Sequence, residues 1–256
     1  MRLYLNTEQF IETNEPLDIS VALRSNESNV RAWYVNPPQF EPVRANGFLG
    51  SVKEGGAVNF RDVYFNPHGH GTHTECLGHI TEEVYSVNQV VKSFFCKAQV
   101  VTMEPVKMDY TGSGEQDLVL TKSQFEAIQW DQSVEAIIIR TLPNDATKNS
   151  RNYSSTNPPF LALDTIEIVN KLAIKHLLID TPSVDRESDE GALAFHHAYW
   201  GVPNSPNFER TITELIYVPS EIEDGVYLMD LQVAPFENDA APSRPVLYKV
   251  YKTEKG

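Results

Sequence analysis

Two short runs of buried-type residues in the middle of the chain, separated by a helical pattern, constrain the fold more than any other feature. Residues 136–140 are rich in isoleucine, and residues 174–179 form a second apolar run of strand length. Between them, residues 161–173 carry apolar positions at helical spacing, and before the first run Thr121 with Glu126 resembles a capped helix start. Strands that alternate with helices predict an α/β fold with a mixed sheet and flanking helices.

Further strand patterns lie on both sides of this region. Alternating or β-branched runs predict strands at residues 17–23, 90–101, 226–233 and 246–251. The polar segment 141–159 is rich in Asn, Ser and Pro, which predicts a loop that covers an active site. The chain has no internal repeat and no linker-like segment, so we predict a single domain over residues 1–256.

Charge and composition exclude several kinds of partner. The 35 acidic and 21 basic residues give a net charge of -14, which repels nucleic acid and anionic lipid. No run approaches the roughly 20 apolar residues of a membrane span. Cys76 and Cys96 are too few for a disulfide framework. We therefore expect a cytoplasmic protein that acts on a small molecule, without nucleic acid or membrane as a partner.

A cluster of histidines is the main indication of chemistry. Four of the seven histidines fall within twelve residues, together with one carboxylate: His68, His70, His73, Glu75 and His79. Neutral imidazoles and a carboxylate are good ligands for Zn²⁺ or Mn²⁺. In an extended segment His73 and Glu75 point to the same side, because side chains alternate with a period of two. The cluster predicts a divalent metal site, with zinc expected first and manganese second.

The segment Gly71-Thr72-His73-x-Glu75-x-x-x-His79 resembles the H-x-G-T-H-x-D-x-P-x-H signature of the cyclase family, which includes kynurenine formamidase (arylformamidase) and isatin hydrolase. Other segments fit in the same order: residues 17–20 resemble the opening strand of the family, residues 180–185 its D-x-x-S-x-D turn, and residues 242–246 its closing element. The resemblance implies a metal-dependent amide or lactam hydrolase with the swivelling β/β/α fold. It also implies a homodimer or a higher homo-oligomer.

Three positions depart from that signature. The aspartate of the family is Glu75 here, its proline is Leu77, and its first histidine is replaced by Gly69. Either His68 or His70 could supply the missing ligand, and we favour His68. The longer Glu75 side chain would shift the ion by about one methylene.

The resemblance implies further ligands in the second half of the chain. His196 aligns with a histidine that the family uses as a metal ligand, whereas its neighbour His197 points elsewhere. The family also uses a glutamate from the next strand, for which Glu214 is our first choice and Glu209 the alternative.

Together with the resemblance, these residues predict hydrolysis of a small amide, formamide, lactam or lactone by metal-activated water. The resemblance implies arylformamidase-like activity on non-peptide C–N bonds. His79 would transfer the proton as general acid and base. A metal-dependent cyclase or dehydratase is the alternative among enzymes. A metal-binding relic without catalysis is the alternative from another class, because the signature has changed at three positions. Trp33 and Tyr34 could stack on an aromatic substrate.

Overall fold

The computed structural model describes residues 1–253, which form many short strands and a few short helices. The strands are β1 (Arg2–Tyr4), β2 (Gln9–Glu12), β3 (Leu17–Asp18), β4 (Gln39–Pro42), β5 (Arg44–Ala45), β6 (Phe48–Leu49), β7 (Arg61–Tyr64), β8 (His73–Glu75), β9 (Phe95–Met103), β10 (Val106–Met108), β11 (Asp117–Leu120), β12 (Ala136–Thr141), β13 (Phe160–Leu161), β14 (His176–Ile179), β15 (Thr211–Glu214), β16 (Gly225–Val233), β17 (Ala240–Lys249) and β18 (Tyr251–Lys252). The α-helices are α1 (Pro67–His70), α2 (Val87–Val90), α3 (Lys122–Ala127), α4 (Ile166–Lys171) and α5 (Ala194–Trp200). Four 3₁₀ turns complete the elements: η1 (Val52–Glu54), η2 (Leu77–Ile80), η3 (Ala146–Asn149) and η4 (Leu163–Thr165).

The central sheet closes on itself. Its strands follow the order β16-β9-β12-β14-β15-β8-β17, and β16 pairs with β17 to complete the ring, while β3 pairs with Val246 and Leu247 of β17. Strands β9, β12, β14 and β15 are parallel, and the remaining pairs in the ring are antiparallel. The mixed α/β sheet with flanking helices that the sequence predicted is therefore confirmed.

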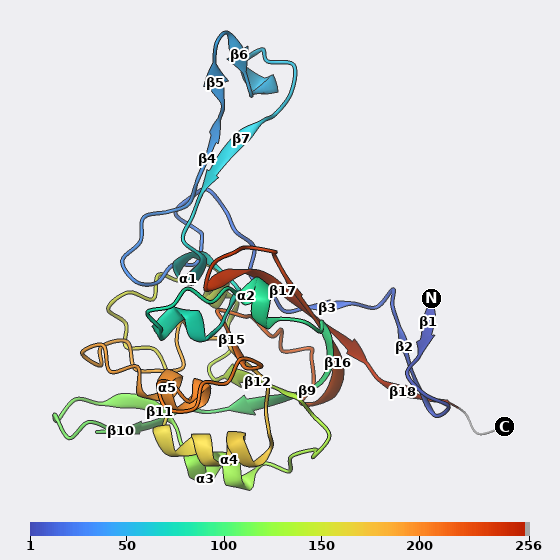
Figure 1. The fold of residues 1–256 in the computed structure, drawn as a ribbon, viewed down its shortest axis with the longest axis vertical. Helices are drawn as coiled ribbons and strands as arrows, with labels where there is room; N and C mark the ends of the chain where they lie inside the picture. The colour runs from blue at the N-terminus through green and yellow to red at the C-terminus, as the bar shows by residue number, and fades with distance from the viewer. Residues whose placement is uncertain (254–256) are drawn as a thin grey trace.

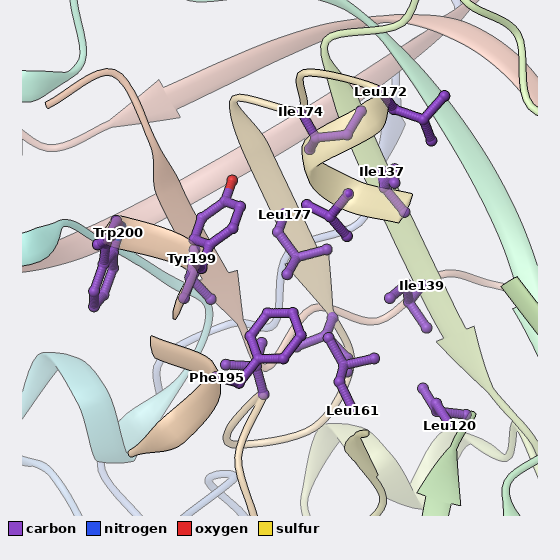
Figure 2. Packing of buried hydrophobic residues seen from close by; sticks show 14 of the residues in the cluster. Leu120, Ile137, Ile139, Leu161, Leu172, Ile174, Leu177, Phe195, Tyr199 and Trp200 are labelled. Carbon is purple, nitrogen blue, oxygen red and sulfur yellow. The ribbon is translucent and has the colours of Figure 1, made fainter. Parts of the chain in front are cut away.

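Side chains alternate between two cores along the parallel strands. Ile137 and Ile139 of β12 face the helices, whereas Ile138 faces the interior of the barrel, and all three are fully buried. Both faces of these strands are covered, which explains why they read as continuous apolar runs. Figure 2 shows the helix-side core, where Phe195 of α5 lies among side chains of the sheet, with Leu177 of β14 beside it.

Several predicted elements are shorter than their sequence patterns. The predicted helix 161–173 begins only at Ile166, because Phe160 and Leu161 pair with β11 as strand β13. The predicted strand 17–23 ends at Asp18, whose carboxylate accepts hydrogen bonds from the main chain and hydroxyl of Ser20. The predicted strand 90–101 begins at Phe95, after the short helix α2.

Two parts of the chain stand away from the barrel (Figure 1). One is a long arm built from the pairs β4–β7 and β5–β6, and the other is the small sheet β1-β2-β18 near the two ends of the chain. Neither part was predicted from the sequence. Among residues 1–253, no helix has both the length and the apolar character to cross a membrane.

Candidate metal centre

Strand register brings three of the predicted ligands onto one face of the barrel. Strand β8 lies between β15 and β17, and His73 pairs with Glu214 across the antiparallel β8–β15 ladder. Glu75 follows two residues later and pairs with Ile212, which belongs to the helix-side core. Paired residues point to the same face, as do residues two apart. His73, Glu75 and Glu214 therefore share one buried face.

Short turns bring the other imidazoles to this face. His68 lies on the single turn α1, where Asn66 accepts a hydrogen bond from the main-chain N–H of Gly69 and Pro67 occupies the first helical position. His79 lies on the 3₁₀ turn η2, which follows β8 directly.

Helix α5 contributes His196. The helix begins against the carboxylate of Asp185, which accepts hydrogen bonds from the main-chain N–H groups of Phe195 and His196. Asp185 therefore fixes both the start of the helix and the position of the His196 backbone.

Three of the imidazoles share one arrangement, namely the buried His73 and His196 and the partly buried His68. Each has one ring nitrogen at an outer acceptor: His68 Nε2 lies 2.8 Å from Asp239, His196 Nδ1 lies 2.6 Å from Asp185, and His73 Nδ1 lies 3.0 Å from the carbonyl of Gly71. The second nitrogen faces the inner carboxylates. His68 Nδ1 and His196 Nε2 each lie 3.0 Å from a different oxygen of Glu75, and His73 Nε2 lies 3.5 Å from Glu214. Metal-binding histidines typically donate their outer N–H in this way.

The spacing and chemistry of these groups fit a divalent cation. Ligand atoms at about 2.1 Å from one ion lie roughly 3.0–3.4 Å from each other, which matches the inner contacts of Glu75. His73 Nε2 is buried and has no hydrogen-bond partner among the described residues. Two groups have ligand atoms within 4.8 Å of one another, namely His68, Glu75 and His79, and His73, Glu75 and Glu214. Glu75 belongs to both groups, so the residues could hold one ion or two.

The carboxylates of the cluster also favour a bound cation, as the pKa values of its side chains indicate. Burial lowers the pKa of His68 and His196, but their carboxylate partners outweigh burial and raise each pKa to about 10. Burial raises the pKa of Glu75, whereas His79, His196 and His68 hold it well below its ordinary value. Burial and the charge of Glu75 raise the pKa of Glu214. The carboxylates therefore keep protons on two histidines, and a divalent ion would displace them.

The structure does not bring every predicted residue to this cluster. Both ring nitrogens of His70 are engaged by main-chain groups, because Nδ1 accepts from the N–H of Asn66 and Nε2 donates to the carbonyl of Asn36. Glu209 is exposed and precedes β15, while Glu214 lies at the opposite end of that strand. His197 Nδ1 bonds to the carbonyl of Val202. The structure therefore contradicts the prediction of His70 and Glu209 as ligands. Their alternatives, His68 and Glu214, lie in the cluster.

Gly69, which stands at the position of the family's first histidine, is tightly packed. A Cβ atom added at Gly69 would lie 2.9 Å from Cγ2 of Val35 and 3.2 Å from the carbonyl oxygen of Ala32. A side chain at this position would therefore displace the segment that follows Ala32. The imidazole comes instead from His68, one residue earlier.

The sequence did not predict a role for Asp239, and it predicted only part of the role of Asp185. Asp239 Oδ2 bonds to both His68 and His79, although it lies 160 residues after His79. Its only signal in the sequence was its place just before the closing element at residues 242–246. Asp185 was predicted to shape a turn, and it also binds the ring of His196.

A pocket of about 310 Å³ opens onto the cluster. Four residues of the cluster line it, namely His68, His79, His196 and Glu214, and other lining residues include Trp33, Val35, Leu193, Ser183 and Arg186. Trp33 and Tyr34 both have a φ of 59°, and the N–H of Tyr34 donates to Ser154 Oγ at 2.9 Å. Consecutive left-handed residues cost about 1–2 kcal/mol each, so contacts with the loop after η3 hold this wall of the pocket in place.

The fold is a closed α/β barrel, and imidazoles and carboxylates converge beside its strand β8. These two features are those of an α/β protein with a candidate metal site. Within that class, the chain belongs to the cyclase family: the family model described as "Putative cyclase" matches residues 17–186. That match ends before His196, Glu214 and Asp239, so the structure alone places these residues in the site. No curated protein matches the chain in sequence.

Solved structures share the fold at low sequence identity. A potential metal-dependent hydrolase with cyclase activity has a TM-score of 0.64 and 14% identity, and the match covers 91% of this chain and 97% of that chain. An isatin hydrolase bound to the product analogue thioisatinate has a TM-score of 0.64 and 13% identity, with 92% of each chain covered. Isatin hydrolase A from Labrenzia aggregata, bound to benzyl benzoate, has a TM-score of 0.60 and 14% identity, covering 91% of this chain and 93% of that chain. The cyclase-like fold is thus confirmed.

Proposed function

We propose that this protein is a metal-dependent hydrolase of a small amide, formamide, lactam or lactone. The observation that carries the proposal is the set of three imidazoles whose inner nitrogens converge on Glu75 and Glu214, while their outer nitrogens are anchored. Zinc is the first choice of metal and manganese the second, because both accept imidazole and carboxylate ligands. Isatin hydrolases share the fold, which supports a cyclic amide among the substrates to be tested.

Each residue of the site has a separate role in the proposed hydrolysis. A bound divalent cation would supply an acidified water and polarise the scissile carbonyl. Glu75 and Glu214 supply the negative charge that holds the cation. His79 reaches the pocket from η2, accepts a proton from the attacking water, and returns it to the leaving nitrogen or oxygen. Trp33 and Leu193 form an apolar wall that excludes solvent from one side of the substrate.

A metal and activity assay tests this proposal. Purified protein should contain zinc or manganese by elemental analysis and should hydrolyse at least one of isatin, formanilide and dihydrocoumarin. His79→Ala should keep its metal and lose about 10²–10⁴-fold in turnover. His197→Ala, a matched histidine outside the cluster, should behave like the wild type.

Other results would contradict the assignment in different ways. A protein that binds metal but hydrolyses none of these substrates would favour the relic without catalysis. Loss of metal in His79→Ala would make His79 a ligand, and the proton-transfer role would then be wrong. The homo-oligomer that the family resemblance implies stays a prediction, for which light scattering of the purified protein is the test.

A further inference from the structure

One carboxylate oxygen serves two histidines at the edge of the candidate metal centre. Asp239 Oδ2 lies 2.8 Å from Nε2 of His68 and 3.2 Å from Nδ1 of His79. The two rings lie beside each other, with their centroids 4.3 Å apart. The side chain of Asp239 is 24% exposed, so this carboxylate lies at the partly exposed edge of the cluster.

The main chain holds Asp239 independently of the two rings. Its carbonyl accepts a hydrogen bond from the N–H of Cys76 at 3.0 Å, and the carbonyl of Asn238 accepts one from the N–H of Val87 at 2.8 Å. Glu237 accepts a hydrogen bond from Ser86 Oγ at 2.8 Å. The segment before β17 is therefore fixed against η2 and α2, and the carboxylate is a rigid reference point for the imidazoles.

These hydrogen bonds fix which ring nitrogen faces outward. Because a carboxylate only accepts hydrogen bonds, His68 donates to Asp239 through Nε2, and its Nδ1 lies on the Glu75 side, where a bound cation would replace the Nδ1 proton. His79 donates through Nδ1 and keeps Nε2 free of this carboxylate. His68 stands one residue before the position of the histidine in the family signature, and Asp239 is the residue that anchors the outer nitrogen of its ring.

We propose that Asp239 is a positioning residue that orients His68 toward a bound cation and His79 toward the substrate through a single oxygen atom. The His79 part rests on the proposed hydrolase function, whereas the His68 part needs only that the cluster binds a metal. Partners of metal-binding histidines typically contribute 10–100-fold to metal affinity or activity. Asp239 is therefore expected to affect both quantities, each through a different histidine.

Zinc affinity tests the His68 part. Asp239→Asn keeps the volume of the side chain and removes its charge, and Asp230→Asn on β16, where the carboxylate accepts a hydrogen bond from Gln232, is the matched control of the same chemistry. By competition with a chelator, Asp239→Asn should bind Zn²⁺ 10–100-fold more weakly than wild type. Asp230→Asn should stay within about twofold. In a His68→Ala background, Asp239→Asn should cause no further loss, because coupled residues are not additive. Unchanged affinity, or the same full loss in that background, would overturn this part.

Ring-nitrogen NMR of the zinc-loaded, ¹⁵N-histidine-labelled protein reads the tautomers directly. Wild type should show a protonated Nδ1 and an unprotonated Nε2 on His79, and Asp239→Asn should change that signature. An identical His79 tautomer in both proteins would overturn the positioning role. This measurement requires no substrate, so it still decides the proposal about Asp239 if the wild type hydrolyses none of the panel and the proposed function fails.

Kinetics separate positioning from binding. On any panel substrate that wild type hydrolyses, zinc-saturated Asp239→Asn should lower kcat at least tenfold with little change in KM. In a His79→Ala background the same substitution should have no further effect on kcat. A further drop in that background would show that Asp239 acts without His79 and would overturn the proposal.

Discussion

Loss of one buried lysine should destabilise the loop that adjoins the candidate site. Lys148 Nζ lies on η3 and donates to the carbonyl of Thr141 at 2.6 Å, to its hydroxyl at 3.0 Å and to Asp180 at 2.7 Å. Lys148 and Asp180 are only 5% and 1% exposed. Lys148→Met would leave the Asp180 carboxylate buried without its cation. Breaking such a pair costs about 3–5 kcal/mol, a large part of a typical stability of about 5–15 kcal/mol.

The matched control is an exposed pair of the same chemistry. Lys175 contacts Glu135 at 2.9 Å, and both side chains are nearly half exposed. Lys175→Met should therefore cost at most about 1 kcal/mol. Adding Asp180→Asn to Lys148→Met should recover much of the loss, because the uncompensated charge is then removed.

Urea unfolding of the metal-free proteins measures these differences. With a slope of about 3 kcal/mol per molar urea, Lys148→Met should lower the midpoint by about 1–2 M without changing the slope. The buried-pair argument is refuted if Lys148→Met and Lys175→Met lose the same amount. A double variant less stable than Lys148→Met would refute it as well.

Four further outcomes follow from the same contacts. His73→Ala should lose stoichiometric metal after dialysis, and full retention in elemental analysis would remove His73 from the site. His196→Ala should lose metal whereas His197→Ala should not, and equal small effects would contradict the ligand role of His196. Burial lowers the pKa of His176 to about 4, below its ordinary value near 6.5. Between pH 6.5 and 4 the folded protein therefore binds fewer protons than the unfolded chain. The contribution of the neutral His176 to the free energy of unfolding is complete above about pH 6.5, and it declines by up to about 3 kcal/mol as the pH falls toward 4. Urea midpoints from pH 7.5 to 5 should fall less in His176→Gln, and parallel declines would contradict this account. Trp33→Ala should raise KM for an aromatic substrate by up to about tenfold without loss of metal, and an unchanged KM would exclude contact with the substrate.

Local patterns in the sequence determined the directions of neighbouring side chains. His73 and Glu75 share a face because they lie two apart on a strand, and β8 has that extended backbone. The buried strands β12 and β14 were predicted from their apolar runs, since a strand covered on both faces needs apolar residues throughout. These features depend on residues close in the chain, so periodicity was enough to find them.

Only the tertiary structure decided which distant groups meet. His68 and His70 lie on one turn, and the choice between them depends on the main chain of Asn36 and Asn66, which engages the ring of His70. Glu214 meets His73 because of the register between β8 and β15, which no local pattern specifies.

Asp239 is the clearest example of a contact that the sequence alone does not predict. It reaches His68 and His79 because β17 pairs with β8 and places the preceding residue beside the cluster. Periodicity fixes the direction of a side chain relative to its neighbours in the chain, whereas the pairing of strands far apart in sequence depends on the packing of the whole barrel. The sequence therefore determined the donor types and the face they share, and the fold decided which of them converge.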